Sequence, residues 1–118
     1  MATAALVIGW GQIVRGREQK ALQVFNEAMQ YYTRLQERGE IESFEPVALE
    51  PHGGDLNGFI LVRGDREKLN RLRYSEEFLR LTNRAGQIAD NVGVISAFIG
   101  DELNRLFADL QAQTSDLA

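Results

Sequence analysis

The sequence contains no cysteine, and this absence removes several classes of site at once. Disulfide bridges, cysteine nucleophiles, thiolate zinc sites and iron–sulfur clusters all require the sulfur that the chain lacks. Histidine is represented by one residue, His52, so the multi-histidine arrangement of most catalytic zinc sites is excluded as well. We therefore expect no bound metal and no other cofactor.

Positive charge and long apolar runs are also scarce. The chain has 13 lysines and arginines against 17 aspartates and glutamates, which gives a net charge of -4. An acidic protein is not drawn to nucleic acid or anionic lipid over long range, so neither is an expected partner. The apolar run at residues 4–10 is far shorter than the ~20 residues of a membrane span. No lysine or arginine precedes it, so we expect no signal peptide and a cytoplasmic protein.

The 118 residues suit one domain, and hydrophobic periodicity divides them into strands and helices. The predicted strands are residues 4–15, 43–50, 57–63 and 92–99. The predicted helices are residues 17–38, a region that starts after Asp65 and is capped again at Ser75, and residues 101–112. The tail at residues 112–118 is expected to be frayed.

The first, third and fourth predicted strands are apolar on both faces, which indicates that both faces of the sheet are covered. The order strand, helix, strand, strand, helix, strand is that of a ferredoxin-like α+β fold. Such a fold is an antiparallel sheet with both helices on one face. The other face is then bare and apolar, so we predict a homodimer in which two sheets pack face to face.

The last predicted helix carries an apolar stripe made of Leu103, Leu106, Phe107 and Leu110. Leaving such side chains in water costs about 1.5–3 kcal/mol for each large one. We therefore expect this helix to pack on its own domain or on a partner rather than to project freely into solvent.

By its element order, its long first helix, the step Ser75-Glu76-Glu77-Phe78 and the short helix after the last strand, the chain resembles the dimeric α/β-barrel superfamily. Relatives there include antibiotic-biosynthesis-type monooxygenases, EthD and NIPSNAP-like proteins, haem-degrading enzymes and ligand-sensing regulators. The resemblance implies one ferredoxin-like domain over residues 1–118 and a homodimer, but no single function. Haem-degrading relatives place their ligand histidine in the second helical region, where this chain has none, which argues against haem.

Trp10, Gln12 and Tyr32 are candidates for a ligand pocket. Trp10 and Gln12 share one face of the first predicted strand, and an indole beside an amide suits a pocket for a flat substrate. Tyr32, on the long helix, faces the same space if that strand face looks toward the helices. The alternative is that Trp10 belongs to the core or to the dimer interface, with Gln12 paired to a neighbour there.

His52 is the remaining candidate, since a lone histidine is the obvious general base. Its segment Pro51-His52-Gly53-Gly54 is a turn by composition, however, and an exposed polar residue is ordinary there. No catalytic residue is assigned.

The leading hypothesis is a homodimer that binds or converts a small organic molecule without a metal, in a pocket between sheet and helices. The alternative is a non-catalytic domain that carries a ligand or only self-associates.

Overall fold

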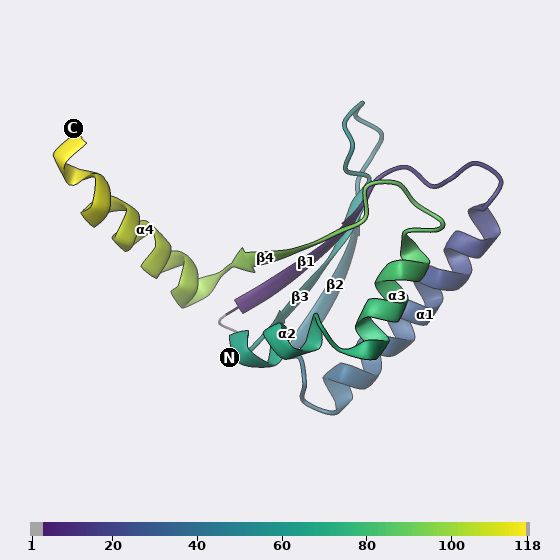
Figure 1. The fold of residues 1–118 in the computed structure, drawn as a ribbon, viewed down its shortest axis with the longest axis horizontal. Helices are drawn as coiled ribbons and strands as arrows, with labels where there is room; N and C mark the ends of the chain where they lie inside the picture. The colour runs from purple at the N-terminus through teal and green to yellow at the C-terminus, as the bar shows by residue number, and fades with distance from the viewer. Residues whose placement is uncertain (1–3, 118) are drawn as a thin grey trace.

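The computed structural model describes residues 4–117, and their strands form one antiparallel sheet (Figure 1). The strands are β1 (Ala4–Trp10), β2 (Ser43–Ala48), β3 (Gly58–Gly64) and β4 (Gly93–Phe98). Their order across the sheet is β2-β3-β1-β4. Helix α1 (Glu18–Glu37) joins β1 to β2, while α2 (Arg66–Leu72) and α3 (Glu76–Ala85) join β3 to β4. The predicted ferredoxin-like α+β fold is therefore confirmed.

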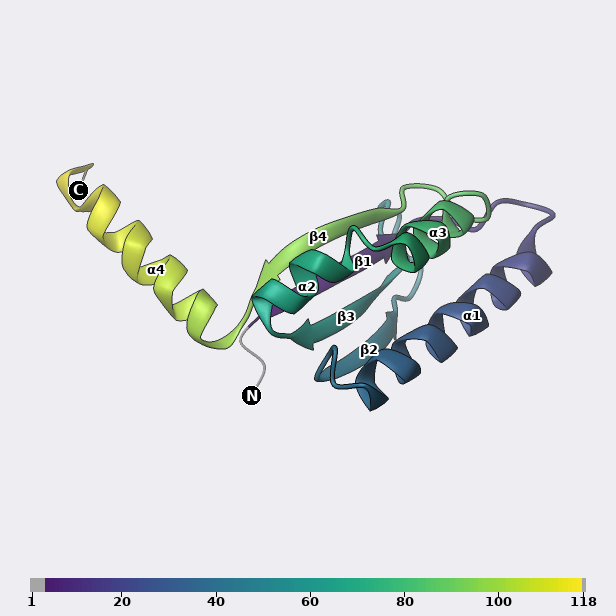
Figure 2. The same cartoon turned by 60° about the horizontal axis from the view of Figure 1, so that its bottom comes forward.

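Helices α1, α2 and α3 cover one face of the sheet, and the core lies between them and the strands (Figure 2). On this face Leu6 and Ile8 of β1 pair with Val62 and Ile60 of β3, and all four side chains are buried. The helices complete the core with Tyr31, Tyr32, Leu35, Leu69, Leu72, Phe78 and Leu81.

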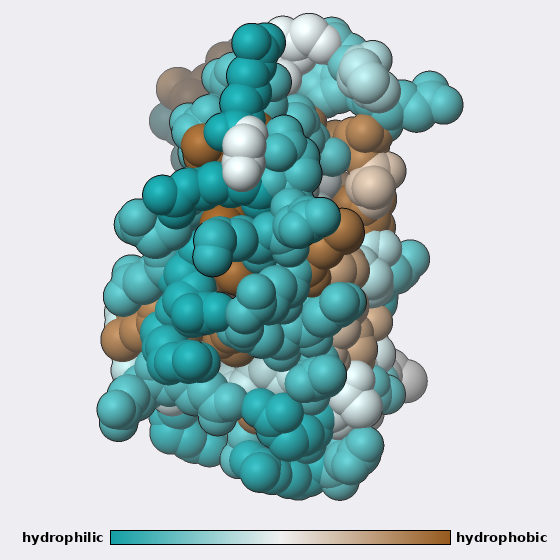
Figure 3. Space-filling model, turned by 90° about the vertical axis from the view of Figure 1, so that its right-hand side faces the viewer, coloured by the Kyte–Doolittle hydropathy of each residue, from teal (hydrophilic) through white to brown (hydrophobic). Residues whose placement is uncertain are grey.

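The opposite face of the sheet is apolar and open. Val7 of β1 pairs with Leu61 of β3 on one side and with Ile95 of β4 on the other, so these side chains form a row across the sheet. Ile95 is 61% exposed. Seen from the end at which α1 and α3 lie, hydrophobic side chains gather along one margin of a mostly hydrophilic surface (Figure 3). The sheet thus has two apolar faces, of which its own helices cover one.

β1 ends at Trp10, well before the predicted end of the first strand. Beyond Trp10 the chain pairs with the segment that precedes β4: the Gly11 amide donates to the Asp90 carbonyl (2.7 Å), and the Asp90 amide donates to the Gln12 carbonyl (2.9 Å). A Cβ on Gly11 would lie 2.7 Å from the Asp55 carbonyl oxygen, so this approach requires glycine. The predicted continuation of one strand through Gln12 is therefore wrong.

The second helical region is split near Ser75, as predicted. Asp65 caps α2, because its carboxylate accepts a hydrogen bond from the Lys68 amide (3.1 Å). The Ser75 hydroxyl instead donates to the Leu72 carbonyl (2.7 Å) at the end of α2, and α3 begins at the next residue. Both helices contribute side chains to the core despite the break.

Helix α4 (Gly100–Thr114) projects away from the rest of the domain (Figures 1 and 2). None of its residues is buried, and Leu106, Phe107 and Leu110 are 42%, 59% and 52% exposed. The alternative in which this helix packs on its own domain is therefore wrong. The backbone stays helical to Thr114, and a 3₁₀ turn (Ser115–Leu117) follows in the segment predicted to be frayed.

Trp10 lies on the helix-covered face, against a glycine of the neighbouring strand. A Cβ on its partner Gly58 would lie 2.5 Å from Trp10 Cζ2 and 2.8 Å from the Val47 carbonyl oxygen. The indole also meets the Phe25 ring of α1 edge-to-face, with centroids 6.3 Å apart. The missing side chain at Gly58 is what lets the indole lie close to the sheet.

We predict that Gly58→Ala displaces the Trp10 indole and lowers stability by about 1–3 kcal/mol, the usual cost of overpacking a tight contact. Denaturant unfolding followed by emission of Trp10, the only tryptophan, measures both effects. Gly93→Ala in β4 is the matched control, because nothing lies within 4 Å of the position that its Cβ would take. Equal unfolding midpoints and emission maxima for the two variants would contradict this packing.

Candidate functional site

A cavity of about 410 Å³ lies between the helix-covered face of the sheet and helices α1 and α3. Small-molecule sites commonly have volumes of roughly 300–1,000 Å³, so this cavity has room for a small organic ligand. Its lining includes Ile8 and Trp10 of β1, Ile60 of β3, Val24, Phe25, Ala28 and Tyr32 of α1, and Leu81, Ala85 and Ile88 from α3 and the segment after it.

The lining is almost wholly apolar, and two of its polar side chains are already engaged within the protein. The Thr82 hydroxyl donates to the Phe78 carbonyl (2.9 Å). The Glu18 carboxylate accepts a hydrogen bond from the Gly16 amide (3.0 Å) and is exposed at the rim. Leu22, which is largely exposed, marks the same opening to solvent. What remains for a ligand is the indole of Trp10 and the hydroxyl of Tyr32.

Tyr32 is the most deeply buried polar residue of the lining, at 4% exposure. Its ring packs against Phe44 and Tyr31, with centroids 5.6 Å and 5.4 Å away. Within residues 4–117 its hydroxyl has no hydrogen-bond partner. Every side-chain polar atom that is fully buried in this part of the chain does have a partner, so the Tyr32 hydroxyl is not fully buried. Tyr32 also lines the cavity.

The protonation state of Tyr32 limits what it does chemically. Burial raises the pKa of this hydroxyl well above its ordinary value of 10.0, with a smaller contribution from Tyr31. At neutral pH the group is therefore protonated, and it acts as a hydrogen-bond donor or acceptor rather than as a base.

Ion pairs hold α1 against α3 beside the cavity. Arg84 donates from Nε and Nη2 to the Glu27 carboxylate (2.9 and 2.7 Å), and Arg34 donates to Glu77 (2.8 Å). The hydrogen bonds from Arg84 lower the pKa of the Glu27 carboxyl, while burial acts in the opposite direction. The bidentate pair has a defined geometry and links the two helices that wall the cavity.

The structure brings two of the predicted pocket residues, Trp10 and Tyr32, to the cavity and leaves Gln12 and His52 outside it. Gln12 is exposed in the loop after β1. His52 is exposed in the turn between β2 and β3, where its Nδ1 accepts from the Gly54 amide (3.2 Å) and its Nε2 donates to the Leu56 carbonyl (2.6 Å). These two bonds hold the ring to its own turn.

The α3 side of the cavity was not predicted from the sequence. Leu81, Ala85 and Ile88 recur at spacings of four and three, the helical signal for a shared face. That signal marks an apolar face but does not distinguish a face that lines a cavity from one that fills the core.

The part of the chain that the structure describes has no cluster of three or more histidine, aspartate or glutamate side chains placed to hold a metal ion. Among the same residues, no helix is both long enough and apolar enough to cross a membrane.

No family model matches the chain, and no curated protein matches it. Solved structures similar to it include a dimeric protein of unknown function and ferredoxin-like fold from Bacteroides fragilis, with a TM-score of 0.58 and 10% identity, covering 81% of this chain and 96% of the other. Another is PA3566 from Pseudomonas aeruginosa, with a TM-score of 0.57 and 16% identity, covering 85% of this chain and 97% of the other. These matches do not confirm the particular superfamily relatives. They show that the chain has a ferredoxin-like fold.

Proposed function

We propose that this protein is a homodimer that binds a small, largely apolar organic molecule in the cavity between the sheet and helices α1 and α3, without a metal. The observation that carries the proposal is an apolar hollow of about 410 Å³ that the side chains do not fill and that the buried residue Tyr32 helps to line. Concave, mostly apolar hollows of this size are typical of small-molecule sites, so this one favours a ligand.

The lining favours an uncharged ligand with a single polar atom. A charge placed among Ile8, Val24 and Leu81 would lose its hydration without gaining a partner. The protonated hydroxyl of Tyr32 suits a ketone, quinone or phenol oxygen, to which it can donate a hydrogen bond. The indole of Trp10 offers a flat surface to a ring system.

Binding has more support than conversion. Glu18 carries the only carboxylate in the described lining, and it lies at the rim, engaged with the Gly16 amide. A general base must reach the proton that it removes, and Tyr32 is too weak an acid to supply a base at neutral pH. A ligand carrier or sensor therefore fits the site more directly than an enzyme.

The homodimer is supported by the open face of the sheet. The row Leu61, Val7 and Ile95 is apolar, and a second copy packed face to face would bury it. Pairing through the β2 edge is disfavoured, because Pro46 has no amide to donate in the middle of that strand. The Bacteroides fragilis protein of the same fold is described as dimeric.

We predict that Tyr32→Phe weakens binding of 1-tetralone about 3- to 10-fold, since a hydrogen bond contributes about 0.5–1.5 kcal/mol net and 1.4 kcal/mol is about tenfold. Tetralin, which has the same ring system without the oxygen, should bind both proteins within about 2-fold of each other. Emission of Trp10 during titration reports on binding. His52→Ala is the control and should bind both probes normally. If small aromatic ketones and phenols leave Trp10 emission unchanged, the ligand-binding part of the proposal fails.

We predict that Ile95→Asp raises the dimer dissociation constant by about 100-fold or more. Burying such a side chain contributes about 1.5–3 kcal/mol, and a two-fold interface counts it twice. Light scattering across micromolar concentrations should give twice the chain mass of 13.3 kDa for the unmodified protein. Leu79→Asp, at an exposed leucine on α3, is the matched control and should remain a dimer. A 13.3 kDa monomer at every concentration would refute the dimer.

A further inference from the structure

Helix α4 has 15 residues and an apolar stripe, and none of its residues is buried by the rest of the chain that the structure describes, residues 4–117. The stripe consists of Leu103, Leu106, Phe107 and Leu110, three of which are exposed and one partly so. Isolated helices of about 12–15 residues are marginal in water even when their sequences favour helix. A stable α4 therefore requires contact along this stripe.

The dimensions of the chain also indicate that α4 is not packed on its own domain. Its radius of gyration is 16.3 Å, whereas a compact domain of this length has about 13.5 Å. Its principal extents are 54, 38 and 22 Å, and Figures 1 and 2 show α4 extending beyond the sheet along the longest of them. The body of the domain is compact, and α4 is what lengthens the chain.

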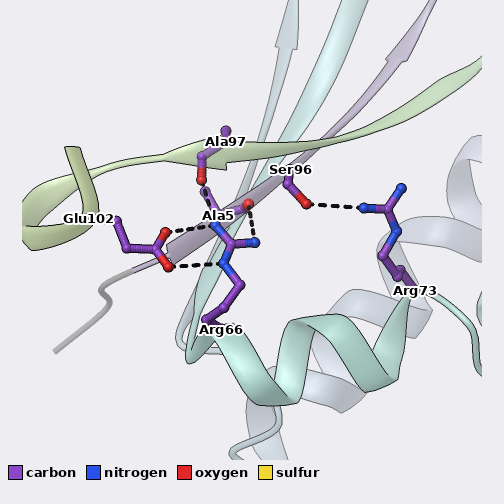
Figure 4. Close-up of polar contacts among 6 residues, drawn as sticks. All are labelled: Ala5, Arg66, Arg73, Ser96, Ala97 and Glu102. Atoms are coloured by element: carbon purple, nitrogen blue, oxygen red, sulfur yellow. Dashed lines mark hydrogen bonds and ion pairs between the residues drawn. The ribbon is translucent and has the colours of Figure 1, made fainter. Parts of the chain in front are cut away.

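Arg66 joins the base of α4 to α2 and β4 (Figure 4). Arg66 of α2 donates from Nε and Nη2 to the Glu102 carboxylate (3.0 and 2.7 Å), and Nη2 also donates to the Ala97 carbonyl (2.8 Å). The hydrogen bonds from Arg66 lower the pKa of the Glu102 carboxyl. One helical heptad further on, Arg73 donates to the Ser96 hydroxyl (3.0 Å) and secures β4 itself. In the arrangement that these contacts join, α4 points away from its own sheet.

We propose that α4 is an arm that docks on the second copy of the chain, with its stripe against the partner beside the interface between the sheets. This inference rests on the proposed homodimer. β4 supplies Ile95 to the open face and runs directly into α4, so the arm continues from the interface strand. In a two-fold dimer the α4 helix of each chain packs on the other chain, so both copies of the stripe are buried.

A membrane surface is the other common cover for an exposed amphipathic helix, and the charges of α4 argue against it. Helices that lie on membranes are rich in lysine and arginine on the polar face. The segment from α4 to the following turn carries Asp101, Glu102, Asp109 and Asp116 against Arg105 alone. Anionic lipid would repel this face, whereas a second copy of the chain offers apolar surface.

The double variant Leu106→Asp with Phe107→Asp tests the arm by sedimentation and light scattering. We expect it to raise the dimer dissociation constant about 100-fold or more, because each tenfold corresponds to about 1.4 kcal/mol and two arms are affected. Ala108→Asp with Ala112→Asp adds the same charge to the opposite side of α4, and we expect a change of less than about 3-fold. A wild-type dimer that the first variant leaves equally tight would overturn the arm and leave the sheet-face dimer standing. A monomeric wild type would instead remove the dimer itself.

Spin labelling gives a second readout, because the chain has no cysteine of its own. A nitroxide on Leu110→Cys should be immobilised in the dimer and become mobile on dilution to the monomer. A nitroxide on Ala112→Cys, on the solvent side of α4, should be mobile in both. A label on Leu110→Cys that stays mobile in the dimer, or stays immobile in the monomer, would contradict docking on the partner.

Discussion

The pairing of β1 with both β3 and β4 is the constraint on which the other layers depend. As an inner strand of the sheet, β1 has neighbours along both edges, and its side chains alternate strictly between the two faces. Leu6 and Ile8 anchor the helices from one face, while Val7 joins the apolar row on the other. A shift of one residue in this register would exchange the two sets, so the cavity and the open face both depend on it.

Much of the fold follows from hydrophobic periodicity, because strands and long amphipathic helices bury faces that repeat in the sequence. The end of β1 does not follow, since alternation continues through Gln12 in the sequence while the backbone at Gly11 turns to pair with Asp90. That contact joins residues far apart in the chain, and no local pattern encodes it. The direction of α4 is missed for a related reason: an apolar stripe shows that a helix needs cover, and long-range contacts such as Arg66 with Glu102 decide where it points.

The sequence predicts only part of the candidate site. Trp10 and Tyr32 are conspicuous as aromatic residues in an apolar strand and helix, yet the face that Trp10 occupies depends on which side the helices pack. Side chains that wall a cavity, such as Leu81 and Ala85, look the same in sequence as side chains that fill a core. The ion pair of Glu27 with Arg84 joins α1 to α3 beside the cavity, and it too links residues far apart in the chain, so no local pattern predicts it.

The opening at Glu18 and Leu22 lies on the helical layer, whereas the row through Val7 lies on the reverse of the same sheet. In two domains packed sheet to sheet, the openings therefore look outward from opposite sides of the assembly. In such an arrangement, the proposed ligand could enter and leave each cavity without separation of the two subunits. The proposed cavity and the open face lie on the two sides of one layer of backbone, in which Trp10 is three residues from Val7 and Ile60 is next to Leu61, so any communication between them has to cross β1 or β3.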